Sequence, residues 1–303
     1  MRHVLSGGLG RFSRSLGLKD TFAGFLFGFP ICFLDEMPNK RRLDLHMLAL
    51  GLARSRQQAQ QLIRAGKVRD QNGKLLDKPG QDVSGSLPLN VKESPRFVSR
   101  GGEKLLEAIE RFPLKVEGRV CLDGGISTGG FTDCLLQHGA ARVYGIDVGY
   151  GQTAWKLRTD PRVTLRERTN LRTLSPEVLY SVNDPLPSLA VADLSFISLR
   201  LVMPAIKNLL KPKGAEALFL VKPQFEVGRE LVRKGGVVRE ASAHVDALRN
   251  VLTAAKSNGW EPRGILASPI TGPAGNHEYL LWLGSEGKED FPSLEGLVAA
   301  TLS

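Results

Sequence analysis

The chain has few of the residues that would indicate a disulfide framework or a metal site. Its 303 residues include only three cysteines, Cys32, Cys121 and Cys134, and none of them forms a CxxC pair. An odd, scattered set of cysteines argues against a disulfide scaffold and a thiolate zinc site, and it fits a reducing cytoplasm. The five histidines are equally scattered. We therefore expect a cytoplasmic protein that needs no metal.

Long apolar runs are missing after residue 36, where no stretch approaches the roughly 20 residues of a membrane-spanning helix. The run TFAGFLFGFPICFL at 21–34 is 14 residues long and follows three basic residues. It resembles the core of a signal peptide, but no small-x-small cleavage site follows it. We interpret residues 1–36 as an N-terminal extension outside the fold, with a true signal as the alternative. No membrane partner is expected.

Positive charge is in excess and unevenly placed. The chain carries 41 Lys+Arg against 31 Asp+Glu, a net charge of +10. Residues 38–100 hold 13 Lys+Arg and 5 Asp+Glu, which is +8 of that +10. A basic excess favours an anionic partner, and nucleic acid is the usual one.

The basic excess falls in a predicted small domain at residues 37–94. Leucines 43, 45, 48 and 50 predict a short helix that ends at Gly51, and Ser55 can cap a second helix with Ala59 and Ile63 on its buried face. Basic and amide residues collect at the start of this second helix and in the loop after it, which suits phosphate contacts; a solvated charged helix is the alternative. The candidate RNA-binding residues are Arg42, Arg54, Ser55, Arg56, Gln60, Arg64, Lys67 and Arg69.

This stretch resembles the small RNA-binding domain named after ribosomal protein S-four. The resemblance rests on the following residues: Arg42-Leu43-Asp44, Gly51, Ser55-Arg56, Ala59, Leu62-Ile63, Gly66, Val68, Gly73 and Lys78-Pro79-Gly80. One departure is Arg69-Asp70-Gln71, where such domains more often continue a strand of alternating apolar residues. The resemblance implies an α+β fold that binds RNA.

Strand-like and helix-like segments alternate from residue 101 to 290, after a predicted linker at 95–100. Strands are predicted at 119–123, 142–147, 163–166, 188–193, 216–222, 262–268 and 278–284, and helices at 103–111, 130–138, 199–210 and 241–258. Such alternation is typical of a mostly parallel sheet that is covered by helices on both faces. Residues 291–303 are left as a C-terminal tail.

The loop DGGISTGGFTD at 123–133 follows the first of these strands and lacks the GxGxxG spacing of a dinucleotide site. An acid followed by glycines is typical of S-adenosylmethionine sites, where Asp123 can meet the ammonium group of the cofactor. Asp147, at the end of the second strand, can accept both ribose hydroxyls, and Asn170 is a candidate adenine contact. The cofactor-binding candidates are Asp123, Gly124, Gly125, Ser127, Thr128, Gly129, Asp147 and Asn170. A glycine-rich turn without a ligand is the alternative.

The motifs occur in a specific order, namely SRGGEKL, DGGISTGGFTD, DVGYGQTAWKLR, ERTN, ADLSFISL, LVKPQFEVGR and GNHEYLLWL. With the basic domain before them, they resemble the TlyA family of ribosomal-RNA ribose methyltransferases, some of which are labelled hemolysins. The match covers roughly residues 40–285, and its second half also resembles FtsJ-type enzymes. The resemblance implies a Rossmann-like S-adenosylmethionine-dependent methyltransferase domain with a mostly parallel seven-stranded sheet. It further implies methyl transfer to a ribose 2′-hydroxyl of ribosomal RNA, free or in assembled subunits, with cytidine as the nucleoside.

FtsJ-like enzymes use a Lys-Asp-Lys-Glu tetrad, and the motifs map it onto Lys104, Asp193, Lys222 and Glu278. Each of these residues, taken singly, has an ordinary structural explanation as a surface charge or a helix cap. A buried lysine beside a second cation gives up its proton more easily and can act as a base. We assign that role to Lys222, with Lys104 stabilising the alkoxide and the two acids orienting the lysines.

Three other functions are alternatives to ribose methylation. A non-catalytic RNA-binding protein would need no tetrad, a hemolysin is suggested only by the family label, and a nicotinamide dehydrogenase would need GxGxxG. Methylation of a pyrimidine carbon would need a cysteine near the fourth strand, whereas Cys121 and Cys134 lie in the first strand and the helix after it. The ribose hydroxyl fits the motifs better than these alternatives.

Overall fold

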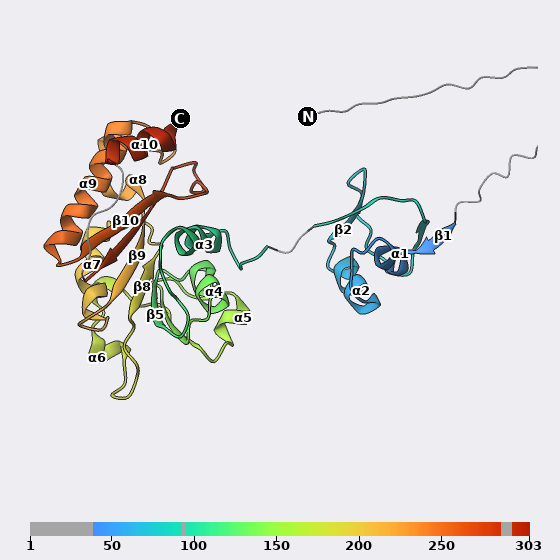
Figure 1. Ribbon diagram of the computed structural model, residues 1–303, viewed down its shortest axis with the longest axis horizontal. Coiled ribbons are helices and arrows are strands. Elements are labelled where there is room, and N and C mark those ends of the chain that lie inside the picture. Colours follow the sequence, from blue (N-terminus) through green and yellow to red (C-terminus); the bar gives the residue numbers. More distant parts are fainter. Residues whose placement is uncertain (1–38, 93–94, 286–292) are drawn as a thin grey trace, which may run out of the picture. The chain divides into compact units, whose positions relative to one another are not determined.

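The computed structural model describes residues 39–92, 95–285 and 293–303 (Figure 1). The chain divides into two compact units, one ending at Glu93 and the other beginning at Ser94. The extension at residues 1–36 that was expected from the sequence lies outside the described residues. Within the described ranges, no helix is both long enough and apolar enough to cross a membrane.

The first unit is a small α+β domain, as expected. β1 (Lys40–Arg42) pairs antiparallel with β3 (Asp82–Ser84), and β2 (Val68–Asp70) pairs antiparallel with β4 (Leu89–Val91). α1 (Leu43–Ala49) and α2 (Arg56–Arg64) contact each other. The core of this unit is formed by the buried residues Leu43, Met47, Ala53, Ala59, Ile63, Val68, Leu76, Val83 and Leu89.

Both predicted helices of this unit form, and the local sequence explains their ends. Gly51, just after α1, has φ +69°, which a glycine adopts at little cost. The hydroxyl of Ser55 accepts the backbone N–H of Gln58 and so caps α2. Leu45 and Leu50, which contributed to the predicted apolar pattern, remain 40% and 45% exposed.

The segment Arg69-Asp70-Gln71 still contributes to a strand. Val68 is buried at the start of β2 and Arg69 is exposed, which is the alternation of a half-buried strand. Asp70 then closes the following turn, because its carboxylate accepts the backbone N–H groups of Asn72 and Lys74, both at 2.9 Å. The polar residues there serve the turn.

The second unit is built on a seven-stranded sheet in the order β10-β11-β9-β8-β5-β6-β7. Figure 1 labels four of these strands, β10, β9, β8 and β5. The five strands β5 (Val120–Gly124), β6 (Arg142–Ile146), β7 (Val163–Arg166), β8 (Leu189–Ala192) and β9 (Glu216–Val221) are parallel. β11 (Tyr279–Gly284) runs antiparallel to β9 and to β10 (Glu261–Ala267). All seven predicted strands form within one residue of the predicted bounds, as do most helix bounds.

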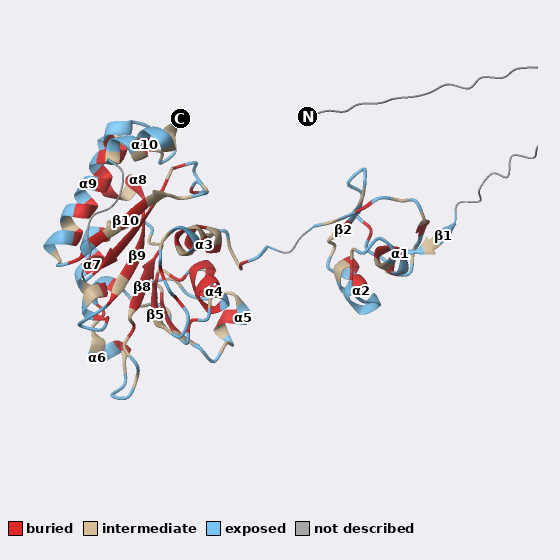
Figure 2. Cartoon of the chain, viewed as in Figure 1, coloured by how far each residue is buried: buried red, intermediate tan, exposed pale blue. Residues whose placement is uncertain are grey.

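Helices cover both faces of this sheet, and the strands are the most deeply buried part of the unit (Figure 2). Side chains of α3 (Gly101–Arg111) and α4 (Gly130–Gln137) join one core cluster, and those of α7 (Leu199–Asn208) and α9 (Ala241–Ser257) join the other. Neighbouring strand residues divide between the clusters: Cys121 lies in the first and Leu122 in the second. Because both faces of the strands are buried, successive residues along a strand are mostly apolar instead of alternating with polar ones.

Shorter helices complete the unit. These are α5 (Trp155–Arg158), α6 (Pro176–Leu179), α8 (Pro223–Glu226) and two 3₁₀ turns, η1 (Leu171–Thr173) and η2 (Arg229–Leu231). They lie in the connections that follow the strands.

Two predicted boundaries need correction. The predicted linker at 95–100 belongs in part to the second unit, because Phe97 is 3% exposed and packs on Gly102, where any side chain would clash with its ring. The predicted tail contains α10 (Leu294–Leu302), whose Val298 is 1% exposed within the core cluster of α9. Packing of one buried side chain therefore fixes each segment to the sheet domain.

Candidate active site

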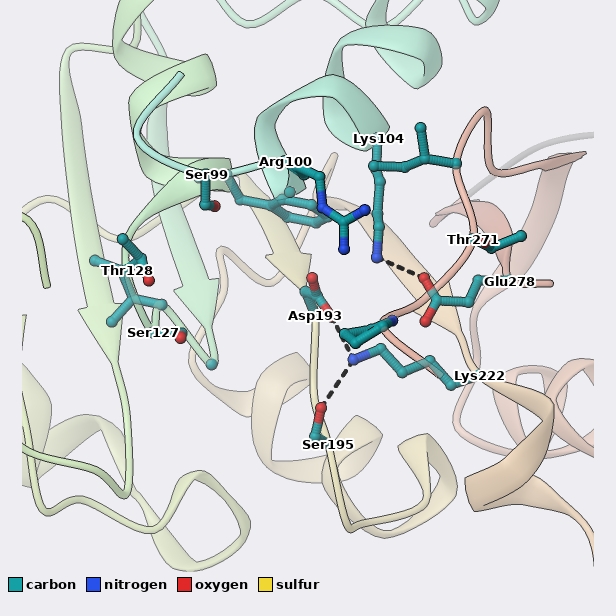
Figure 3. Close-up of a pocket in the computed structure, with 17 residues that line it drawn as sticks. Ser99, Arg100, Lys104, Ser127, Thr128, Asp193, Ser195, Lys222, Thr271 and Glu278 are labelled. Atoms are coloured by element: carbon teal, nitrogen blue, oxygen red, sulfur yellow. Dashed lines mark hydrogen bonds and ion pairs between the residues drawn. The ribbon is translucent and has the colours of Figure 1, made fainter. Parts of the chain in front are cut away.

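The four residues of the predicted tetrad, together with Arg100, line one cavity of about 300 Å³ in the second unit (Figure 3). Lys104 comes from α3, Asp193 follows β8, Lys222 follows β9, and Glu278 precedes β11. Because β11 runs antiparallel, its first residue pairs with the last residue of β9, Tyr279 with Val221. Glu278 therefore reaches the same edge of the sheet as Asp193 and Lys222, at the carboxyl ends of the parallel strands.

The four side chains form two ion pairs. Lys104 Nζ lies 2.5 Å from Glu278 Oε2, and Lys222 Nζ lies 2.6 Å from Asp193 Oδ1. The residues Lys104, Lys222 and Glu278 are only 7%, 9% and 2% exposed, whereas Asp193 is half-buried. Each lysine thus has its own carboxylate, and the four charges sum to zero.

The cavity also contains polar residues that the sequence reasoning did not single out. Lys222 Nζ donates to the hydroxyl of Ser195 at 2.9 Å, and Ser99, Arg100 and Thr271 line the same space (Figure 3). Ser99, Arg100 and Ser195 stand inside the quoted motifs SRGGEKL and ADLSFISL, which gave a signal that could have found them. Thr271 lies in the connection between β10 and β11, outside the quoted motifs, so the sequence gave no signal for it.

A second cavity, of about 580 Å³, shares Gly125, Ser127, Asp193 and Ser195 with the first. Its polar lining includes the predicted residues Asp147 and Asn170. Its apolar lining consists of Ile146, Val148, Leu171, Leu194, Phe196, Ile197 and Val202. The shared residues show that the two cavities are adjacent, so a molecule in one lies beside the ion pairs of the other.

Asp147 organises the loops around the second cavity. Its Oδ2 accepts the backbone N–H of Ser127 and its Oδ1 accepts that of Gly149, both at 2.7 Å. Asn170 has a similar local role, because its side-chain oxygen accepts the N–H of Arg172 at 3.0 Å and caps η1. A carboxylate has about four acceptor sites, so Asp147 retains capacity for two further donors.

The glycines of the 123–133 loop divide into two kinds. Gly125 lines both cavities, has φ +84°, and any Cβ there would lie 2.8 Å from the carbonyl oxygen of Asp193. Gly124 and Gly129 line neither cavity; a Cβ on them would collide with Leu171 and Leu157. These two glycines therefore permit close packing, while Gly125 also keeps the cavities open. Thr128 lines the smaller cavity.

Asp123 does not line either cavity. Its side chain is fully buried, and its Oδ2 accepts the hydroxyl of Thr132 at 2.6 Å. Its Oδ1 has no hydrogen-bond partner among the described residues. Burial raises the pKa of Asp123 to about 7, against the opposing effect of the Thr132 hydrogen bond. The structure does not bring this carboxylate to the cavity surface, where the sequence predicted it.

Neither described cysteine is placed for catalysis. Cys121 and Cys134 are free and buried, and burial raises the pKa of each thiol to about 12. A thiol with such a pKa is not a nucleophile at neutral pH. Across the described ranges, no group of three or more His, Cys, Asp and Glu side chains is arranged to hold a metal ion.

The candidate RNA-binding residues of the first unit are partly organised by one buried acid. The carboxylate of Asp44, which is fully buried, accepts hydrogen bonds from Arg42, Arg56 and Gln60 at 2.9–3.2 Å. The bonds from Arg42 hold the pKa of Asp44 well below its usual range, despite burial. Arg42 and Arg56 themselves remain exposed. Asp44 thus holds two guanidinium groups in place at the surface.

The other candidates in this unit have varied roles. Arg54 and Arg64 are exposed, Ser55 caps α2, and Lys67 is half-buried. Arg69 is exposed and donates to the carbonyl oxygen of Gly73 at 2.8 Å, which braces the turn after β2.

Comparisons with known proteins agree with this architecture. Residues 97–285 match the model of the FtsJ-like methyltransferases, and residues 41–87 match that of the S4 domain. The 16S/23S rRNA (cytidine-2′-O)-methyltransferase TlyA of Mycobacterium tuberculosis strain H37Rv is 50% identical over 249 residues, covering 82% of this chain and 91% of that protein. Hemolysin A of Brachyspira hyodysenteriae is 40% identical, covering 79% and 98%.

A solved structure is similar over most of the chain as well. The structure entitled "Putative hemolysin from Streptococcus thermophilus" has a TM-score of 0.64 and 41% identity, and it covers 86% of this chain and 95% of its own. The family match spans the cavities and the sheet, and the S4 match spans the unit around Asp44. The chain therefore belongs to the FtsJ-like methyltransferases and, within them, to the TlyA family, in which an S4 domain precedes the methyltransferase domain.

Proposed function

We propose that this protein methylates the 2′-hydroxyl of a cytidine ribose in ribosomal RNA, with S-adenosylmethionine as the methyl donor. The observation that carries the proposal is the meeting of Lys104, Asp193, Lys222 and Glu278 around one cavity. Residues up to 174 positions apart in the chain converge there in two ion pairs. Membership of the TlyA family, with a relative named for cytidine 2′-O-methylation, supports the choice of acceptor.

The second cavity fits S-adenosylmethionine in its chemistry. Asp147 has free acceptor capacity for two ribose hydroxyls, and the apolar lining around Leu171 and Phe196 suits an adenine ring. Asn170 would supply a polar contact to that ring, and Gly125, Ser127 and Thr128 would leave room for the amino-acid chain. We assign the ammonium group of the cofactor to the unpartnered oxygen of Asp123; because Asp123 is fully buried and lines neither cavity, this contact requires the loop to shift when the cofactor binds. When bound, S-adenosylmethionine supplies an electrophilic methyl group on a sulfonium.

The residues of the smaller cavity would handle the proton of the acceptor hydroxyl. A sugar hydroxyl is hardly ionised at neutral pH, so a base must take its proton as the oxygen forms its new bond. Lys222 is an ammonium in its ion pair with Asp193; after it has released that proton to solvent, the free amine takes the proton of the hydroxyl. Asp193, 2.6 Å from Nζ, orients the amine and stabilises the ammonium that forms. Lys104, oriented by Glu278, stabilises the negative charge that develops on the ribose oxygen.

The S4 domain would deliver the RNA. Its exposed arginines around Asp44 and along α2 form the basic surface expected for phosphate contacts. Because the substrate is ribosomal RNA or an assembled subunit, we place the protein in the cytoplasm. A non-catalytic RNA-binding protein would have no use for two lysines buried with paired acids in one cavity. The name hemolysin is that of a relative, and no residue described above supports a hemolytic activity for this chain.

Transfer of labelled methyl from S-adenosylmethionine to isolated small and large ribosomal subunits tests the proposal. We expect label on RNA from one or both subunits, located on a cytidine ribose, and none with Lys222→Ala. Absence of label on both subunits, with cofactor bound normally, would overturn the proposed substrate. Label on a base instead of a ribose would overturn the proposed acceptor.

A further inference from the structure

A strongly basic loop follows the active-site lysine in the chain. Residues 229–239, here called the basic loop, carry Arg229, Arg233, Lys234 and Arg239 against one acidic residue, Glu230. All four basic residues are exposed. Arg229 is the last residue of the motif LVKPQFEVGR, residues 230–239 lie outside the motifs quoted above, and the whole segment lies outside the S4 domain.

The tip of the basic loop is a tight turn with an open surface. Arg233 N donates to Val237 O at 3.1 Å, and Gly236 N donates to Arg233 O at 2.9 Å. Gly235 and Gly236 have φ of +96° and +79°, and no atom lies within 4 Å of the position that a Cβ would take on either one. The backbone at the tip is therefore not covered by other parts of the described chain.

Buried side chains fix this turn to the wall of the active-site cavity. Asn276 is 2% exposed; its side-chain oxygen accepts Val238 N at 3.0 Å, and its amide donates to Gly236 O at 2.7 Å. His244, fully buried, contacts Val238 O through Nε2 at 3.0 Å. Asn276 stands two residues before Glu278, in the connection that contributes Thr271 to the cavity.

The other end of the basic loop is also attached to the site. Lys222 is followed directly by α8 (Pro223–Glu226), and the loop begins three residues after that helix. The loop thus begins seven residues after Lys222 in the chain, and its tip is hydrogen-bonded to Asn276, two residues before Glu278. These bonds hold the backbone that carries the cations close in the chain to two residues of the tetrad.

The charges of the basic loop are largely uncompensated. Arg233 forms an ion pair with Glu240. Over the described part of the chain, Arg229, Lys234 and Arg239 have no ion-pair partner. An ordinary solvated loop would explain exposed cations, but it would not need a buried asparagine that uses both ends of its amide to fix the turn. Fixed, unpaired cations are suited to phosphate groups.

We infer that the basic loop is a second RNA-binding surface, which takes the sugar-phosphate backbone next to the target nucleotide. The inference rests on the proposed function, because that function makes ribosomal RNA the substrate that the loop would contact. Its role is to hold the strand at the cavity, in addition to capture of the RNA by the S4 domain. Contacts to phosphate carry no base preference, so the loop contributes affinity and position.

The test compares two double variants of the full-length protein. Lys234→Gln with Arg239→Gln removes two unpaired cations of the basic loop. Lys211→Gln with Lys213→Gln is the matched control, because these exposed lysines lie before β9, at the opposite end of the strand from Lys222. Binding to isolated ribosomal subunits with unmodified rRNA is measured over a range of salt concentrations, and S-adenosylmethionine affinity is measured separately.

We expect the loop variant to bind subunits roughly tenfold more weakly and the slope of log Kd against log salt to fall by about 1 to 2. The control variant should match the wild type, and cofactor affinity should be the same in all three proteins. Equal binding and equal slopes for the loop variant and the wild type would overturn the inference. If the loop variant loses affinity while the wild type binds subunits without methylating them, the RNA-binding surface stands and the proposed reaction fails.

Discussion

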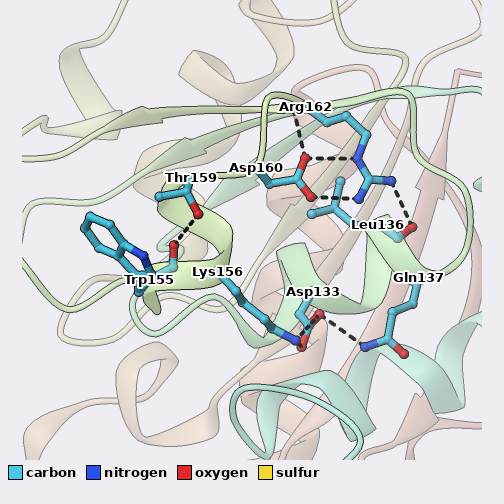
Figure 4. A network of polar contacts seen from close by, with 8 residues as sticks. All are labelled: Asp133, Leu136, Gln137, Trp155, Lys156, Thr159, Asp160 and Arg162. Carbon is cyan, nitrogen blue, oxygen red and sulfur yellow. Dashed lines mark hydrogen bonds and ion pairs between the residues drawn. The ribbon is translucent and has the colours of Figure 1, made fainter.

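The carboxylate of Asp133 on α4 accepts the backbone N–H of Val98 at 2.8 Å, although the two residues are 35 positions apart. The same carboxylate accepts Lys156 Nζ at 2.9 Å and Gln137 Nε2 at 3.1 Å (Figure 4). Gln137 also donates to the carbonyl oxygen of Arg96. Asp133 therefore fixes the segment immediately before Ser99, Arg100 and Lys104 enter the active-site cavity.

Replacing Asp133 should loosen that segment. We expect Asp133→Ala to lower the free energy of unfolding by about 1–3 kcal/mol, because the backbone N–H of the half-buried Val98 loses its acceptor. Asp133→Asn is the control: it keeps an acceptor oxygen and loses the ion pair to Lys156, whose side chain is 55% exposed and adds little. Urea unfolding of both variants measures the difference. Equal stability of the two variants would show that the Val98 hydrogen bond is not the important contact.

The role of Lys222 as base predicts a loss of turnover without a loss of cofactor binding. Lys222→Ala should lower kcat by about 10²–10⁴-fold, the usual effect of removing a general base. Lys222→Arg should be almost as impaired, since a guanidinium keeps the charge and does not give up its proton. Single-turnover methyl transfer measures kcat, and calorimetric titration with S-adenosylmethionine measures binding. Substantial activity in the arginine variant would mean that Lys222 acts only through its charge.

The buried Asp123 predicts a stability that depends on pH. Its pKa is raised to about 7 in the folded protein, so below pH 7 the folded state holds a proton that the unfolded state, with a pKa near 3.8, has lost. The stability from this group is therefore present at low pH and is lost as the pH rises from about 4 to 7. Asp123→Asn stays neutral and should lack this dependence.

The measurement is urea unfolding of the wild type and Asp123→Asn between pH 4.5 and 8, without cofactor. The variant should gain stability relative to the wild type as pH rises, by about 3 kcal/mol between pH 4.5 and 8. A constant difference across this range would contradict the raised pKa. Weaker S-adenosylmethionine binding by the variant at pH 8 would support a contact between Asp123 and the cofactor's ammonium group.

Two glycines with similar backbone conformations should respond differently to substitution. Gly151→Ala places a Cβ in open space at φ +75°, so we expect only the conformational cost of about 1–2 kcal/mol. Gly125→Ala, at φ +84°, adds a clash 2.8 Å from Asp193 O and narrows both cavities. It should cost more stability and also weaken cofactor binding. Unfolding and binding measurements on both variants test this, and equal effects would rule out the close contact as the reason for glycine at 125.

The strands of the second unit were predictable because strands buried on both faces are nearly continuous apolar runs, such as Glu216–Val221. Motifs at the ends of these strands identified Asp193, Lys222 and Glu278, which the structure brings to one cavity with Lys104; their catalytic roles stay a prediction. The pairing within the site was not predictable: nothing local indicates that Glu278 contacts Lys104 or that Asp193 contacts Lys222. The contact of Glu278 with Lys104 depends on the reversed direction of β11, and that of Asp193 with Lys222 on the parallel pairing of β8 with β9; both are properties of the whole sheet.

Other features of the second unit also depend on contacts that the sequence around them does not indicate. Asp123 is predicted as a cofactor ligand, and the sequence does not indicate that its carboxylate is buried and hydrogen-bonded to Thr132, nine residues further along. Phe97 looks like part of a linker until Gly102 provides a surface for its ring. Helix α10 is short and has no clear alternation of polar and apolar faces. Its packing on α9 identifies it as part of the domain.

The cancelling charges of the two ion pairs imply a division between capture and chemistry. A tetrad with no net charge exerts little long-range pull on a polyanion, so attraction of RNA falls to arginines and lysines outside it. Dissolved ions screen the charges of those exposed groups strongly, and they screen the buried ion pairs much less. Added salt should therefore raise KM for ribosomal subunits steeply while kcat stays nearly constant, so that ionic strength sets how often the enzyme engages a ribosome and not how fast it then reacts.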